Sequence, residues 1–257
     1  MLDGLFLGAR EDAAKREATL PRTEIEALAR DAAPVRSAIN ALGVRPKIHV
    51  IAEIKRRSPS KGALADIVDP VALATQYEAG GASVISVLTE GRRFGGSLED
   101  LSSISRAVSI PVLRKDFLDT EYQIIEARAH GADLVLLIMA WLSDDLATRL
   151  LALAAEWGMH ALVEAHSGEE VDRAVALGAG IVGINARNLT TFEVDPGLFG
   201  TLVARIPEGI VTVAESAVVN SQDVTRYREQ GAQAVLVGES LVTGTDPEQR
   251  VKEFVAA

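Results

Sequence analysis

An alternation of apolar runs and helical patterns fills the chain from residue 48 onward and constrains the fold more than any other feature. Eight short apolar runs are typical of buried strands: 49–55, 83–89, 111–116, 133–140, 161–166, 181–186, 211–216 and 234–240. Eight segments of 3.6-residue periodicity alternate with them: 70–80, 97–108, 120–130, 143–157, 168–178, 195–205, 220–231 and 247–256. Four junctions repeat glycine-alanine before a strand, in GGASVISV, HGADLVLL, LGAGIVGI and QGAQAVLV. Such a series predicts parallel strands joined by crossover helices.

Eight βα units in series indicate a closed sheet. A (β/α)8 barrel, or TIM barrel, usually takes about 250 residues, and this chain has 257. A doubly wound open sheet is the alternative, but it rarely holds eight consecutive units without a large interruption. We therefore predict an α/β chain with a single TIM-barrel domain over residues 1–257, whose βα units occupy 48–257. Residues 1–47 are expected to form a helical extension of two or three helices packed on the barrel, since they are too few for a good core of their own.

Signals at the helix ends agree with these boundaries. Asp69-Pro70 and Ser143 are typical helix starts. Glycines mark the expected stops at Gly80-Gly81, Gly131, Gly158, Gly178 and Gly231.

Charge and composition exclude several classes of function. A formal net charge of −10 argues against nonspecific nucleic-acid binding, which needs a basic surface. The chain has no cysteine, which excludes disulfides, thiolate zinc sites and cysteine nucleophiles. The longest apolar stretch, 134–142, is too short to span a bilayer, and the first residues lack a signal peptide's apolar core. We expect a cytoplasmic protein with no nucleic-acid or membrane partner.

Ionisable side chains gather at the carboxyl ends of the expected strands. Glu53 and Lys55 lie two residues apart on a strand that otherwise reads as core, so both face the same side. Other strands end with Lys115, Glu164, Asn185 followed by Arg187, and Glu215. In this barrel, side chains at the carboxyl ends of strands point into the mouth, where catalysis occurs. Because buried unpaired charges cost several kcal/mol each, a ring of them is hard to explain by stability alone. An internal salt-bridge network remains the structural alternative.

Two other groups of residues surround this ring. Ser216, Ala217, Gly238 and Glu239 follow the last two strands, where this fold commonly binds phosphate; turn chemistry is the alternative explanation. Ser58, Ser60 and Lys61 follow the first strand, in a loop that either closes over a ligand or is simply exposed. Phe94 and Phe117 follow the second and third strands, where they either contact an aromatic substrate or cap the barrel.

Two further patterns predict no site. GAGIVG at 178–183 matches G-x-G-x-x-G, but it follows a helix and opens a strand, the reverse of the dinucleotide-binding arrangement. The four histidines have no metal-ligand spacing, although His166 lies two residues after Glu164 and shares its face. We therefore expect no metal ion and no cofactor.

The motifs IAEIKRRSPSKG, PVLRKDF followed by EYQIIEA, ALVEAH, GINARNL, VAES and VLVGESL together resemble the indole-3-glycerol phosphate synthase family of tryptophan biosynthesis. The resemblance covers the whole chain and is specific, because other phosphate-binding barrels share the last two motifs but not the first two. It implies a carboxy-lyase that acts on 1-(2-carboxyphenylamino)-1-deoxyribulose 5-phosphate, closing the pyrrole ring with loss of carbon dioxide and water, without metal or cofactor.

The resemblance also implies a role for each site residue. Lys115 matches the general acid that protonates the substrate ketone, and Glu164 the general base of the dehydration. Lys55 matches a lysine that pairs with the substrate carboxylate and serves as an acid when the hydroxyl leaves. Glu53 matches a carboxylate that either positions a neighbouring group or removes a proton. The substrate-binding set is Asn185, Arg187, Glu215, Ser58 and the anthranilate pocket of Phe94, Phe117 and Leu189. The phosphate-binding set is Ser216, Ala217, Gly238 and Glu239.

Coupling among the charged groups is expected to set their pKa values. Neighbouring lysines lower each other's pKa, whereas flanking glutamates raise it. The four catalytic groups therefore titrate together.

Two positions depart from the family pattern. Ala217 stands where the family usually has glycine, which would weaken phosphate binding if that amide must approach closely. Ala186 replaces an asparagine and is expected to face the helices, with little effect.

Two other functions stay open at this stage. One is a sugar-phosphate isomerase such as phosphoribosylanthranilate isomerase, which would need an aspartate and usually a cysteine or a second aspartate at the strand ends. The other is a noncatalytic phosphate-binding subunit, which would need no Lys/Glu set. We expect a small sugar-phosphate partner and a monomer.

Overall fold

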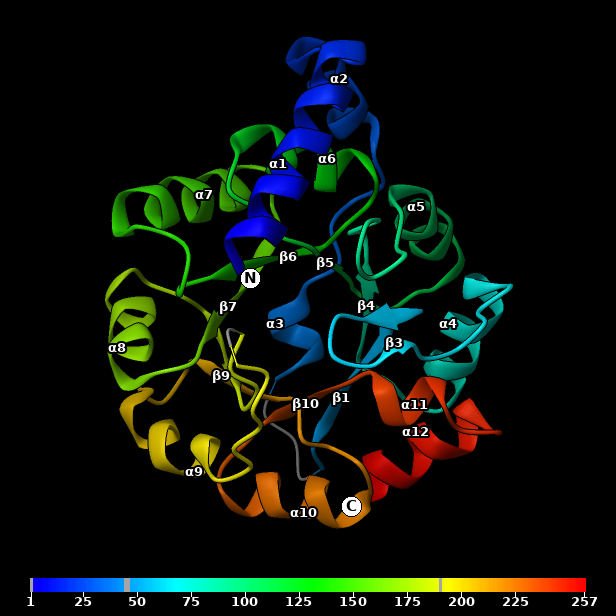
Figure 1. Cartoon of the computed structure of the whole chain (residues 1–257), viewed down its shortest axis with the longest axis vertical. Helices are drawn as coiled ribbons and strands as arrows, with labels where there is room; N and C mark the ends of the chain where they lie inside the picture. The colour runs from blue at the N-terminus through cyan, green and yellow to red at the C-terminus, as the bar shows by residue number, and fades with distance from the viewer. Residues whose placement is uncertain (1, 44–46, 190) are drawn as a thin grey trace.

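The computed structural model describes residues 2–43, 47–189 and 191–257, and its centre is a closed barrel of eight parallel strands (Figure 1). Around the barrel the strands follow the order β1-β10-β9-β8-β7-β6-β5-β4, and β4 pairs with β1 to close it. Their bounds are β1 His49–Ile54, β4 Val84–Leu88, β5 Val112–Lys115, β6 Leu134–Ile138, β7 His160–Ala165, β8 Ile181–Asn185, β9 Val211–Glu215 and β10 Ala234–Val237. The predicted TIM barrel is confirmed, with all eight expected strands.

Helices surround the barrel as the periodicity predicts (Figure 1). The outer helices are α4 Pro70–Ala79, α5 Leu98–Ala107, α6 Glu121–Ala129, α7 Asp144–Glu156, α8 Gly168–Ala176, α9 Leu198–Leu202 with the 3₁₀ turn Val203–Arg205, α10 Ser221–Glu229 and α12 Pro247–Ala256. Asp69 and Ser143 cap α4 and α7 through their side chains. The glycine stops have a physical reason, since Gly131, Gly158, Gly178 and Gly231 all have positive φ, which L-residues rarely adopt.

Alternation along each strand separates two apolar clusters. Outward side chains of β1, such as Val50 and Ala52, pack with the helices in the larger cluster. Inward side chains such as Ile51 join a second cluster inside the barrel. Glu53 continues the inward series by the same alternation and is buried, so β1 brings a carboxylate into the interior.

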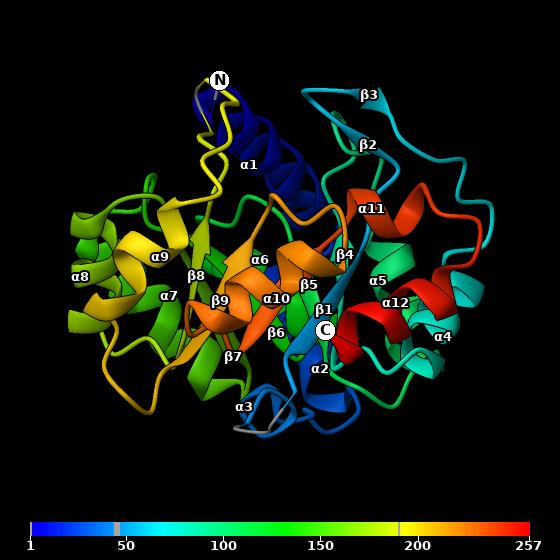
Figure 2. The same ribbon diagram turned by 90° about the horizontal axis from the view of Figure 1, so that it is seen from below.

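The N-terminal residues form three helices, as expected: α1 Leu2–Thr19, α2 Arg22–Asp31 and α3 Ala38–Ala41. Ile25 and Ala29 of α2 pack with Tyr122 and Ile125 of α6. Arg16 of α1 binds the buried carboxylate of Glu126 with two hydrogen bonds of 2.5 and 2.8 Å. Figure 2 shows α1 beside the loop after β8, at the end of the barrel opposite α3.

Two local elements differ from the sequence prediction. The expected loop after β1 contains a hairpin of β2 Arg57–Ser58 and β3 Gly62–Ala63. The apolar run at 234–240 ends as a strand at Val237, because Gly238 starts the short helix α11 Glu239–Val242. In the described part of the chain, none of the helices is long and apolar enough to cross a membrane.

Candidate active site at the barrel mouth

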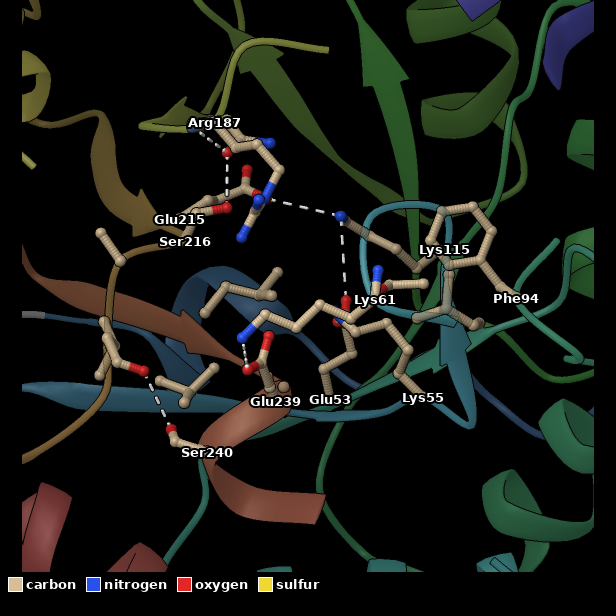
Figure 3. Close-up of a pocket in the computed structure, with 18 of the residues that line it drawn as sticks. Glu53, Lys55, Lys61, Phe94, Lys115, Arg187, Glu215, Ser216, Glu239 and Ser240 are labelled. Carbon is tan, nitrogen blue, oxygen red and sulfur yellow. Dashed lines mark hydrogen bonds and ion pairs between the residues drawn. The ribbon is translucent and has the colours of Figure 1, made fainter. Parts of the chain in front are cut away.

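A cavity of about 750 Å³ opens at the carboxyl ends of the strands. Its lining includes every site residue predicted from the sequence: Glu53, Lys55, Ser58, Phe94, Lys115, Phe117, Glu164, Asn185, Arg187, Leu189, Glu215, Ser216, Ala217, Gly238 and Glu239. Their side chains come from the carboxyl ends of barrel strands and from the loops that follow them, which this fold brings to one place (Figure 3).

Lys115, the last residue of β5, lies at the centre of the charged groups. Its Nζ is 3.6 Å from Glu164 Oε2, 3.6 Å from Glu215 Oε2 and 3.9 Å from Glu53 Oε2. All four side chains are largely buried, with Lys115 15% exposed and the carboxylates 2–3%. Within the described residues, Lys115 is thus the one cation that acidic side chains from β1, β7 and β9 share.

This arrangement shifts the pKa values of the cluster in different directions. Burial would lower the pKa of Lys115, but Glu164, Glu215 and Glu53 raise it well above its usual value. Burial would raise the pKa of Glu164, yet Lys115 and His166 hold it far below its usual range. For Glu215, burial and the charge of Glu164 raise the pKa well above normal, against the pull of Lys115. These shifts favour the charged forms of Lys115 and Glu164 and the neutral form of Glu215.

Glu53 connects the two lysines. Lys55 Nζ is 2.6 Å from Glu53 Oε1, while Glu53 Oε2 faces Lys115. Burial would raise the pKa of Glu53, but the two lysines lower it. Glu53 and Lys55 therefore do not pair with one another alone, because Glu53 also faces Lys115.

Two glycines make room for these carboxylates. A Cβ atom at Gly183, in the middle of β8, would lie 2.1 Å from Glu215 Oε1. A Cβ at Gly238 would lie 2.5 Å from Glu53 Oε1 and 3.1 Å from Lys55 Nζ. Such distances are far below van der Waals contact, so the glycines permit the charged side chains to occupy these places.

An apolar wall lies beside the charged cluster. Phe94 and Phe117 have ring centroids 5.9 Å apart and line the cavity with Leu189. Leu5 of α1 also lines it, and its neighbour Phe6 packs edge-on against Phe117 at 5.3 Å. This wall has the shape and chemistry to hold an aromatic ring.

A strained backbone follows β9 at the other side of the cavity. Ser216 and Ala217 have φ values of 67° and 57°, in the left-handed region that disfavours residues with a Cβ. Ser216 Oγ donates a hydrogen bond of 2.8 Å to Asn185 Oδ1, which also accepts the backbone N–H of Arg187 at 3.0 Å. Strained residues of this kind cost about 1–3 kcal/mol and cluster at functional sites. The pair thus points to a ligand-contacting turn.

Comparisons with known proteins agree with this site. A sequence model of the indole-3-glycerol phosphate synthase family matches residues 2–254. The chain is 54% identical over 261 residues to indole-3-glycerol phosphate synthase of Paenarthrobacter aurescens strain TC1, covering 100% of this chain and 96% of that protein. It is also 54% identical over 260 residues to indole-3-glycerol phosphate synthase 1 of Streptomyces coelicolor, covering 100% and 95%. The chain belongs to the indole-3-glycerol phosphate synthase family.

Solved structures of more distant proteins resemble this chain in fold only. The 3-hexulose-6-phosphate synthase of Salmonella typhimurium aligns with a TM-score of 0.65 and 14% identity, over 81% of this chain and 97% of that one. The N-acetylmannosamine-6-phosphate 2-epimerase of Clostridium perfringens aligns with a TM-score of 0.63 and 16% identity, over 87% and 97%. Together the comparisons confirm the family, the TIM barrel and the carboxy-lyase activity of tryptophan biosynthesis expected from the motifs.

Ala217, one departure from the usual indole-3-glycerol phosphate synthase pattern, lies in the strained turn after β9. Ala217 takes the place of the customary glycine and adopts positive φ, so its Cβ adds strain that glycine would not have. Ala186, the other departure, is buried and is absent from the lining of the cavity.

Several residues of this site were not predicted from the sequence. Glu90 accepts backbone N–H groups of Arg92, Arg93 and Phe94 at 2.7–2.9 Å, and so shapes the loop that carries Phe94. Lys61 of the hairpin was expected in a loop that either closes over a ligand or is exposed, but its partner was not predicted; it binds Glu239 at the cavity mouth (Figure 3). The sequence could have indicated Glu90, because it is an acidic residue directly after the strand that ends in SVLT. Leu5 could not be predicted in this way, because its place in the cavity lining depends on how α1 crosses the barrel.

Proposed function

We propose that the chain converts 1-(2-carboxyphenylamino)-1-deoxyribulose 5-phosphate to indole-3-glycerol phosphate, with Lys115 as general acid and Glu164 as general base. The observation that carries these roles is the burial of Lys115 Nζ among Glu53, Glu164 and Glu215 at the floor of the cavity. A charged lysine and an ionised carboxylate 3.6 Å apart supply a proton donor and a proton acceptor at neutral pH.

The first part of the reaction uses the cations. The ring carbon that bears the substrate carboxylate attacks the ketone carbon, and Lys115 donates its proton to the ketone oxygen as that bond forms. Lys55 pairs with the substrate carboxylate, which then leaves as carbon dioxide. The raised pKa of Lys115 keeps it protonated at neutral pH, so its proton and its charge are both present where negative charge develops on the ketone oxygen.

The second part is the dehydration. Lys55 donates a proton to the departing hydroxyl, and Glu164 accepts a proton from the substrate, so that one water is lost. Glu53 positions Lys55, to which it is bound at 2.6 Å. Positioned acids and bases each contribute about 10²–10⁴-fold to rate.

The remaining site residues bind the substrate in this proposal. Phe94, Phe117 and Leu189 hold the anthranilate ring, and Asn185, Arg187, Glu215 and Ser58 contact the sugar and the polar network. The backbone at Ser216, Ala217, Gly238 and Glu239 holds the phosphate, supported by the strained turn and by the absence of a Cβ at Gly238.

Turnover measurements test the proposal. Purified protein is mixed with the ribulose phosphate substrate, and the product is followed by indole fluorescence. We expect Lys115→Met and Glu164→Gln each to lower kcat by about 10²–10⁴-fold, the usual contribution of one acid or base. Lys252→Met and Glu248→Gln, at an exposed ion pair on α12, are matched controls and should retain wild-type rates. Absence of product with the wild-type protein would refute the substrate, and wild-type rates in either site variant would refute that residue's role.

A further inference from the structure

His166 is a buried basic side chain at the barrel mouth that has no part in the reaction described above. It directly follows β7, two residues after Glu164, and its side chain is 12% exposed. Its Nε2 lies 3.3 Å from Glu164 Oε1, and its Nδ1 lies 3.4 Å from Glu170 Oε2. The imidazole therefore lies between two carboxylates, one at the active site and one on α8.

On its Nδ1 side, the imidazole contacts Glu170 in the first turn of α8. Ser167 caps the helix by accepting the backbone N–H of Glu170 at 3.2 Å. Glu170 in turn accepts the backbone N–H of His166 at 2.8 Å. These two hydrogen bonds to the backbone anchor Glu170 at the start of α8. Glu170 thus presents a fixed carboxylate to the Nδ1 side of the His166 ring.

On its Nε2 side, the imidazole faces Glu164 and, beyond it, Lys115. Glu164 Oε1 is directed to His166, and Glu164 Oε2 is directed to Lys115 at 3.6 Å. Glu215 of β9 lies beyond, within 3.6 Å of the same Lys115 Nζ. The two oxygens of Glu164 therefore each face a different basic group.

The two carboxylate neighbours favour a charged imidazole. Both neighbours are carboxylates, which only accept hydrogen bonds when ionised. A neutral imidazole has one N–H, whereas the imidazolium has two, so only the cation can interact favourably with Glu164 and Glu170 together. Burial would lower the pKa of His166, but Glu164 and Glu170 raise it to about 10.

We propose that His166 is a positioning residue of this active site, a third cation that holds Glu164 Oε1 so that Oε2 faces Lys115 and the substrate. This inference rests on the proposed role of Glu164 as the base. Without the imidazolium, the Glu164 carboxylate would be free to rotate, and its charge would be balanced by Lys115 alone.

Kinetics in two backgrounds test this role. His166→Gln should lower kcat about 10–100-fold, the usual effect of losing a group that orients a catalytic ligand, while KM changes little. The same substitution in a Glu164→Gln background should cause no further loss, because the effect passes through Glu164. His160→Gln, at the opposite end of the same strand, is the matched control and should leave kcat unchanged. Equal loss in both backgrounds, or a wild-type kcat for His166→Gln, would overturn the proposal.

A titration tests the charge without relying on turnover. The ring signals of His166, assigned by comparison with His166→Gln, should titrate near pH 10 in the wild-type protein. Glu170→Gln keeps an oxygen for the backbone N–H but removes one charge, so it should lower this pKa and move the alkaline limb of kcat to lower pH. Titration near pH 6–7 in the wild-type protein would refute the third cation even if the substrate is correct. Conversely, loss of the proposed function would appear as missing wild-type turnover with this titration intact.

Discussion

Replacing Lys115 by methionine should affect stability as well as rate, because it removes the cation shared by three buried carboxylates. At 3.6 Å and an effective dielectric constant of about 20, one full ion pair contributes about 5 kcal/mol. Desolvation of Lys115 in the wild-type protein offsets part of this, and breaking a buried pair typically costs about 3–5 kcal/mol. For a chain of this size, about 2–4 °C of Tm corresponds to each kcal/mol. We therefore expect Lys115→Met to lower Tm by about 6–20 °C at pH 7.

The lost stability of Lys115→Met should depend on pH in a direction that the pKa shifts of the carboxyl groups determine. In the wild-type protein, Glu53 and Glu164 have lowered pKa values, so their contribution to stability is present at neutral pH and is lost in acid. Without Lys115, repulsion among the carboxylates and burial raise their pKa values in the folded state. Folding then favours the protonated forms, so the variant is least stable relative to wild type at neutral pH. The deficit should shrink as the pH falls from 7 toward about 4.5, where carboxyl groups become neutral.

Thermal unfolding monitored by circular dichroism at several pH values is the measurement. Lys252→Met, at an exposed pair, controls for loss of a lysine and should change Tm little at any pH. The double variant Lys115→Met/Glu164→Gln should recover part of the lost stability, because one unpaired charge is removed. A Tm deficit that stays constant from pH 7 to 5, or the absence of a deficit at pH 7, would refute this electrostatic explanation.

Two further changes test the shape of the cavity and its cover. Gly183→Ala introduces a Cβ that would lie 2.1 Å from Glu215 Oε1, so it should displace Glu215, cost about 1–3 kcal/mol of unfolding free energy and lower kcat. Gly4→Ala, with no atom within 4 Å of the added Cβ among the described residues, is the control in the same unfolding and rate assays. Lys61→Ala breaks the exposed pair between the hairpin and Glu239, which is worth at most about 1 kcal/mol, so KM should rise by no more than about fivefold. A fall in kcat at constant KM would show that Lys61 acts on the chemical step instead.

The barrel was predictable from the sequence because its strands are short apolar runs and its helices carry local stop signals. Gly131 and Gly158, for example, adopt the positive φ that their place after a helix indicates. Helix α11 was missed because it has only four residues, Glu239–Val242, which are too few to show a 3.6-residue period. The hairpin at 57–63 was missed because its polar sequence has no alternating pattern.

The positions of the charged groups were predictable, but their ionisation states were not. Strand-end placement requires only the fold and the period of two, and it correctly brought Glu53, Lys115, Glu164 and Glu215 to one cavity. From the sequence, Glu164 and Glu215 are the same residue type at the same depth. Their opposite pKa shifts depend on neighbours in three dimensions, since Glu164 contacts His166 as well as Lys115.

The distribution of partners explains why one carboxyl group of the cluster differs from the others. Charges alternate along the mouth in the order Lys55, Glu53, Lys115, Glu164, His166 and Glu170, and each of the first two carboxylates uses its two oxygens for two different cations. Glu215 stands outside this series, because among the described residues Lys115 is its sole ion-pair partner. That lysine is already shared by Glu53 and Glu164, so burial prevails at Glu215 and raises its pKa. The raised pKa of Glu215 favours its neutral form, so it adds no fourth negative charge to the three carboxylates that already face Lys55, Lys115 and His166. Fewer negative charges at the mouth suit a substrate that carries a carboxylate and a phosphate.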